Sequence, residues 1–127
     1  MKAIEKIKDI ELLVDTFYTA ILKDEQLAPF FAHLNFVEHL PKMVHFWSFV
    51  LLDGPGYTTN VTEKHASMKL NKVLFDHWVK LFHETVDQLF EGEKAELAKQ
   101  RATVLGWTMA SKFNWVFFKL IEWTYKT

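Results

Sequence analysis

The chain has 127 residues, of which 50% are hydrophobic and 16% aromatic, as expected for one globular domain with a substantial core. Because 15 Lys and Arg balance 16 Asp and Glu, no net field attracts nucleic acid or an anionic membrane surface. The absence of cysteine excludes disulfides, thiolate nucleophiles and thiolate-bound metal, so any metal must rest on histidine, carboxylate or a cofactor.

The N-terminal segment, residues 1–8, alternates charged with apolar residues and lacks the unbroken apolar stretch of a signal peptide. The longest apolar runs, such as residues 115–118, are too short to span a bilayer. We therefore expect one cytoplasmic domain over residues 1–127, with no membrane and no nucleic acid among its partners.

Apolar residues recur at helical spacing, and four Gly and three Pro leave few breaks, so the pattern predicts an all-α protein. Asp9 is the predicted N-cap of a first helix, and Tyr18 lies at the edge of its apolar face. That face consists of Leu13, Val14, Phe17, Ile21 and Leu22. Residues 24–33, which include Phe31, are expected to form a short helical corner.

A second long helix is predicted from about Asn35 to Leu52, with Trp47 on its apolar face. Its start depends on Pro41, which a helix accommodates without a kink only in its first turn. The Gly and Pro residues of 53–56 end the helix, and a loop follows through about residue 61. Thr62 is then the cap of a very short helix.

A third long helix is predicted over residues 73–90, with Trp78 on its apolar face, and residues 91–93 end it at Gly92. The last helix is expected from about residue 94 to residue 123 and includes Met109. No internal repeat, low-complexity tract or domain boundary interrupts these elements.

Simple catalytic motifs are missing. None of the three serines lies in a Gly-flanked turn between strand and helix, and no glycine loop could cradle a phosphate. The pairs His39/His45 and His77/His83 are six residues apart, a spacing that places their side chains on different faces of a helix. Helix-borne zinc pairs need a spacing of three or four, so these pairs do not predict a zinc site.

His65 lies between a flexible loop and a strongly apolar helix, with the small residue Ala66 beside it. An axial haem ligand needs a neutral imidazole on a short, adjustable element that faces an apolar slot. A single histidine is also commonly a surface or hydrogen-bonded core residue, and position alone leaves both interpretations open.

Six landmarks follow one another along the chain: Phe17-Tyr18, Leu27-Ala28-Pro29-Phe30-Phe31, His39 eight residues before Trp47, Tyr57, His65, and the segment 75–82 around Trp78. Over roughly residues 9–115, the order of these landmarks resembles that of the truncated haemoglobins, and within that family the third group. The glycine-pair motifs of the other two groups are absent here, which is itself a trait of the third group.

The resemblance implies a shortened globin in which two antiparallel helix pairs form a two-over-two sandwich around haem b. It implies that His65 binds the iron and that Tyr18, His39 and Trp78 surround the bound gas. The haem contacts expected beside His65 and Trp78 are Phe31, Lys42, Phe46, Trp47, Lys64 and Met109. Lys42 and Lys64 would pair with the haem propionates.

Several alternatives stay open. Tyr18 and Trp78 fit equally as core aromatics, Met109 as core filler, and His39 as a gate that precedes the helix instead of a pocket donor. The predicted function is binding of dioxygen, nitric oxide and carbon monoxide, including oxygen transport, with oxidation of nitric oxide or reduction of peroxide as side activities. The alternatives are a haem-dependent peroxidase or nitric-oxide dioxygenase served by a separate reductase, and a haem-free helical interaction module.

Overall fold

The computed structural model describes residues 1–32, 35–53 and 72–110, with no description of the side chains of residues 107–110. Within these ranges it contains the α-helices α1 (Ile7–Lys23), α2 (Ala28–Phe31), α3 (Phe36–Leu52), α5 (Lys72–Leu89) and α6 (Glu93–Ala110). The predicted all-α class is confirmed. Across the described ranges, no helix is long and apolar enough to cross a membrane. The predicted short helix around His65 and the predicted helix beyond residue 110 lie outside the described residues.

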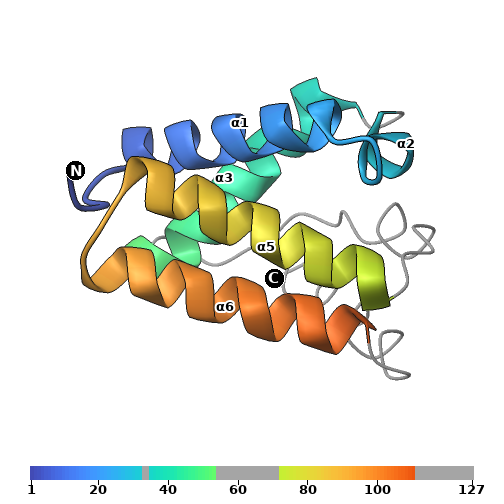
Figure 1. Cartoon of the computed structure of the whole chain (residues 1–127). Helices are drawn as coiled ribbons and strands as arrows, with labels where there is room; N and C mark the ends of the chain where they lie inside the picture. The colour runs from blue at the N-terminus through green and yellow to red at the C-terminus, as the bar shows by residue number, and fades with distance from the viewer. Residues whose placement is uncertain (33–34, 54–71, 111–127) are drawn as a thin grey trace.

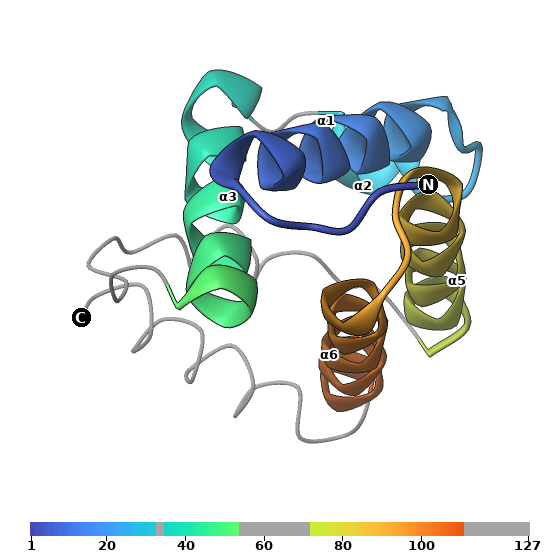
Figure 2. The same ribbon diagram turned by 90° about the vertical axis from the view of Figure 1, so that its left-hand side faces the viewer.

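The helices are arranged as two pairs (Figure 1). Helices α5 and α6 run antiparallel beside each other, joined by a short turn, and form the most extensive contact among the described helices. Helix α1 lies along α5 and crosses α3 at a steep angle, which is clearest in the rotated view (Figure 2). Helix α3 contacts α1 at this crossing and also contacts α6.

The first helix begins at Ile7, so the prediction of Asp9 as its N-cap is wrong. Asp9 lies inside the first turn, where its carboxylate accepts hydrogen bonds from the backbone N–H groups of Glu5 (2.9 Å) and Lys6 (3.0 Å). A carboxylate at this third helical position caps by reaching backwards, as in a capping box. The prediction of Leu22 in the apolar face is also wrong, because Leu22 is 41% exposed and lies one step around the helix from buried Ile21.

The Asp9 carboxylate also anchors the N-terminal segment. Its Oδ1 atom lies 2.7 Å from Lys2 Nζ, and the backbone N–H of Glu91 donates to the Lys2 carbonyl at 3.1 Å. The hydrogen bond from Lys2, helped by those from the two backbone amides, lowers the pKa of the Asp9 carboxyl to about 2 against the opposing effect of burial. Ile4, within this segment, is buried and belongs to the hydrophobic core.

Helix α3 begins at Phe36, and Asn35 caps it by accepting from the Glu38 amide at 3.4 Å. Pro41 therefore lies inside the helix beyond its first turn, contrary to the sequence-based expectation. Pro41 has no N–H to donate to the Val37 carbonyl, and both residues lie on the exposed side of α3, where water can serve that carbonyl. His39 is consequently part of the helix and does not precede it.

The turn between α5 and α6 contains Gly92, whose φ of 102° is in the region that favours glycine. This agrees with the predicted end of the third helix at residues 91–93. Further along, the two helices approach closely at Gly106, where a Cβ atom would collide with Val79 Cγ2. Glycine at this position permits the tight α5–α6 packing.

Candidate functional site

A hydrogen bond between Tyr18 and His39 lies at the crossing of α1 and α3. The Tyr18 hydroxyl is 3.0 Å from His39 Nε2, and the two rings meet edge to face with centroids 5.3 Å apart. The residues are only 7% and 6% exposed. Two polar side chains, 21 positions apart in sequence, therefore satisfy each other inside an apolar region.

Burial raises the pKa of the Tyr18 phenol well above its ordinary value. The phenol consequently keeps its proton throughout the physiological range, and one O–H group is always present in this region. Which atom donates depends on the histidine tautomer. If His39 Nε2 carries the proton and donates to the Tyr18 oxygen, the phenol proton is available to a third group.

A shell of aromatic rings surrounds the pair. Four rings contact Tyr18 edge to face, with centroid distances of 5.4 Å to Phe17, 6.2 Å to Phe31, 5.9 Å to Phe36 and 5.3 Å to the His39 imidazole. Phe36 also contacts His39 at 6.5 Å. We did not predict Phe36 as a site residue, although its spacing of three from His39 places both on one face of α3.

Trp78 belongs to the same cluster through an intermediate ring. It packs edge to face on Phe17, with centroids 5.5 Å apart, and is nearly parallel to Phe82 at 6.1 Å. Trp47 of α3 also stacks on Phe82, with ring centroids 4.9 Å apart. Trp78 is half-buried, whereas Phe82 and Trp47 are buried. Phe82 thus connects the tryptophans of α3 and α5, and Phe17 connects this group to Tyr18.

The remaining predicted site residues are less closely connected. Phe46 is half-buried and packs edge to face on Trp47 at 5.3 Å. Lys42 is half-buried on α3. Met109 lies in α6, and its side chain is not described. His65, Lys64 and Tyr57 are outside the described residues.

Two other polar features, one buried and one partly buried, were not predicted. Ser48 on α3 is buried, and its Oγ atom has no hydrogen-bond partner within residues 1–32, 35–53 and 72–110. The second feature is a contact between His77 Nε2 on α5 and Asp24 Oδ2 at the end of α1. No local pattern could have predicted this contact, because its partners are 53 positions apart in sequence.

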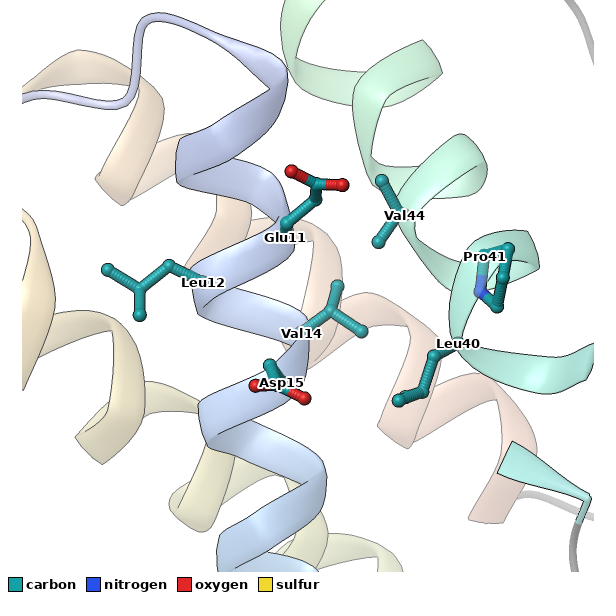
Figure 3. Close-up of a pocket in the computed structure, with 7 residues that line it drawn as sticks. All are labelled: Glu11, Leu12, Val14, Asp15, Leu40, Pro41 and Val44. Carbon is teal, nitrogen blue, oxygen red and sulfur yellow. The ribbon is translucent and has the colours of Figure 1, made fainter. Parts of the chain in front are cut away.

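A surface groove of about 420 Å³ lies on the outer side of the α1–α3 crossing. It is lined by Glu11, Leu12, Val14, Asp15, Leu40, Pro41 and Val44. In Figure 3 the α1 residues form one wall, and Leu40, Pro41 and Val44 of α3 form the other. None of the predicted haem or gas contacts lines this groove, so it is separate from the buried Tyr18–His39 pair.

Globins pack crossing helices pairwise around the haem pocket, and the described helices pack and cross in this way. The sequence model of the bacterial-like globin family matches residues 2–111, so the chain belongs to this family. The fold is that of a truncated globin, as the sequence predicted.

Known relatives point to one branch of the family. The chain is 28% identical over 119 residues to a group 3 truncated haemoglobin of Campylobacter jejuni, covering 88% of this chain and 91% of that protein. The crystal structure of a group III truncated haemoglobin from C. jejuni matches with a TM-score of 0.74 and 27% identity, over 89% of this chain and 98% of that one. Membership of the globin family supports haem-based binding of small diatomic gases.

The described residues fit the ligand side of a haem group. Such a site needs apolar and aromatic walls and a hydrogen-bond donor in a dry environment. The ring shell provides the walls, and the Tyr18 hydroxyl is a buried donor that stays protonated. Within the described ranges no group of three or more His, Asp or Glu side chains could hold a metal ion directly.

Proposed function

We propose that the chain binds dioxygen, and also nitric oxide and carbon monoxide, on haem b, with His65 as the iron ligand. The observation that supports this proposal is the buried hydrogen bond between Tyr18 and His39 inside the aromatic shell. When bound, haem supplies a ferrous iron that coordinates a diatomic gas and donates electron density to it. The protein must then provide a donor that distinguishes dioxygen from less polar gases.

Tyr18 is the proposed donor. In the tautomer that carries the proton on Nε2, His39 donates to the Tyr18 oxygen and directs the phenol proton away from itself. A hydrogen bond from this O–H to a partly charged ligand is strengthened by the low local dielectric. The Trp78 indole N–H is the proposed second donor, held near Tyr18 through Phe17.

The remaining assignments form part of the same proposal. Phe31, Phe46 and Trp47 would contact the haem ring, and Lys42 and Lys64 would pair with its propionates. Met109 would contact the ring from the side of His65. A His65→Ala variant is expected to lose tight haem binding or to need added imidazole, and an unchanged Soret spectrum would contradict the assignment of His65.

The role of Tyr18 is tested by measuring gas release from the haem-loaded protein. Tyr18→Phe removes one hydroxyl and should raise the dioxygen dissociation rate about ten-fold or more, because a bond to a charged group contributes about 1.5–3 kcal/mol. Carbon monoxide is less polar when bound and should respond less. The matched control is Phe31→Leu, which alters the ring contact to Tyr18 but removes no donor.

The control is expected to shift both gases to a similar extent. Equal changes for both gases in Tyr18→Phe would show that Tyr18 acts by packing and not by hydrogen bonding.

A second function, reduction of peroxide or oxidation of nitric oxide with electrons from a separate reductase, is favoured by the same Tyr18–His39 contact. The His39 imidazole, held at 3.0 Å from the Tyr18 hydroxyl in a dry pocket, would be the general acid. His39→Leu should then lower peroxide consumption, measured with a chemical reductant, about 100-fold. Consumption within about three-fold of the parent rate would exclude His39 as the acid, since general acids contribute far more.

A further inference from the structure

The contact between His77 and Asp24 joins two parts of the chain that are distant in sequence. His77 Nε2 on α5 hydrogen-bonds to Asp24 Oδ2 at the C-terminal end of α1. Their side chains are 28% and 16% exposed, so the pair is largely withdrawn from solvent. A hydrogen bond to a carboxylate is stronger than one between neutral groups, and partial burial strengthens it further.

Backbone hydrogen bonds also hold Asp24. Its Oδ1 atom accepts from the backbone N–H groups of Gln26 (2.9 Å) and Leu27 (3.0 Å), while its own N–H donates to the Ile21 carbonyl at 3.1 Å. One carboxylate oxygen thus shapes the corner that leads into α2, and the other holds α5. The last residue of α2 is Phe31, whose ring packs on Tyr18.

His77 is also connected to Tyr18 through ring contacts. The next residue, Trp78, packs edge to face on Phe17 with centroids 5.5 Å apart, and Phe17 packs on Tyr18 at 5.4 Å. The two paths from the His77–Asp24 contact therefore both end on Tyr18, one through Phe31 and one through Trp78 and Phe17. We call the Phe31 ring one wall around Tyr18, and the Trp78 and Phe17 rings the other wall. A change in the separation of Asp24 and His77 would move these two walls relative to each other.

The Asp24 carboxylate remains charged in this setting. Burial alone would raise the pKa of Asp24, but the hydrogen bonds from His77 and from the Leu27 and Gln26 amides outweigh it and leave the pKa below its ordinary value. The pair therefore keeps an ionised acceptor opposite the imidazole, which restrains α5 against the corner.

We propose that His77 and Asp24 are a positioning pair that fixes the Trp78 wall against the Phe31 wall around Tyr18 and thereby controls ligand retention. This inference rests on the proposed gas-binding function. Neither residue needs to touch the ligand. Both act through the aromatic residues that follow them in the chain.

The test uses the haem-loaded full chain and three variants. His77→Leu removes the donor, and His77→Gln keeps an N–H at a similar distance along the side chain. His83→Leu is the matched control: His83 also lies on α5 and hydrogen-bonds to α6, at 3.0 Å to the Lys99 carbonyl and 2.8 Å to Thr103 Oγ1. A purely structural role predicts the same behaviour for His77 and His83.

We expect His77→Leu to raise the dioxygen dissociation rate about three-fold or more, as for other residues that act on a site through intermediates. The infrared band of bound carbon monoxide should broaden or split, because the walls of the pocket are no longer held in one arrangement. His77→Gln should restore both properties, and His83→Leu should reduce the free energy of unfolding while leaving both properties unchanged. If His77→Leu does not fold, His77→Ala removes the donor without adding bulk and is measured in its place.

Parental release and a single parental carbonyl band in His77→Leu would overturn the inference, as would an equal effect of His83→Leu. Tyr18→Phe is measured in parallel to separate this inference from the proposed function. Faster dioxygen release in Tyr18→Phe with parental release in His77→Leu overturns only the positioning role. Parental release in both variants overturns the proposed donor as well.

Discussion

The Tyr18–His39 contact predicts a specific pattern of stability in a double-mutant cycle. Tyr18→Phe removes the hydroxyl that His39 Nε2 contacts at 3.0 Å, and His39→Leu removes the imidazole from a position that is only 6% exposed. Each single variant leaves one polar atom of the pair buried without its partner, at a cost of about 1–3 kcal/mol in the free energy of unfolding. The double variant removes both polar groups together and should cost much less than the sum of the single changes.

The expected coupling free energy is about 1–2 kcal/mol, the range found for contacting residues in such cycles. Urea unfolding of the four haem-loaded proteins, monitored by circular dichroism at one fixed haem concentration, measures it, since haem binding itself adds to stability. Phe36→Leu combined with His39→Leu is the comparison cycle, because Phe36 contacts His39 only through its ring. Additive effects in the Tyr18–His39 cycle, within about 0.5 kcal/mol, would refute a hydrogen bond that contributes to folding.

Three further predictions concern the framework of the fold. The pKa of Asp9 is lowered from 3.8 to about 2, so its contribution to stability, on the order of 2 kcal/mol, should be complete above pH 4 and lost as the pH falls toward 2. An acid titration of unfolding free energy measures this, and Asp9→Asn should flatten it. Gly106→Ala should reduce the free energy of unfolding by about 1–3 kcal/mol, because the Cβ of the new alanine collides with Val79. Combining it with Val79→Ala should relieve part of the loss. A Gly106→Ala variant as stable as the parent would contradict this packing. Ser48→Ala should increase the free energy of unfolding by up to about 1 kcal/mol, measured by urea unfolding, because it removes a buried Oγ atom that lacks a hydrogen-bond partner among the described residues. A clear loss of stability would show that the hydroxyl is satisfied.

Much of the helical framework follows from local pattern alone. The repeat of apolar residues at spacings of three and four predicted α1, α3, α5 and α6, and Gly92 marked the turn between the last two. These features depend on neighbours within one or two helical turns, so the sequence carries them directly. The ordered landmarks at Tyr18, His39 and Trp78 also pointed to the globin family that the comparisons show.

Helix starts were harder to predict. Asp9 satisfies the chemistry of an N-cap and equally that of a third-position carboxylate, and only the salt bridge to Lys2 and the N-terminal segment decided between them. Pro41 is tolerated inside α3 because that side of the helix faces solvent, which depends on where α3 lies relative to α1. Local propensity cannot contain this information.

The sequence alone determined which side chains share a helix face, because the helical repeat fixes their angular spacing. It could not determine which faces meet. The contacts of Tyr18 with His39 and of Asp24 with His77 join residues 21 and 53 positions apart, and they exist only because α1 crosses α3 and lies along α5. Those crossings are set by the packing of many side chains at once, so the buried hydrogen bond at the centre of the candidate site was decided by the tertiary structure.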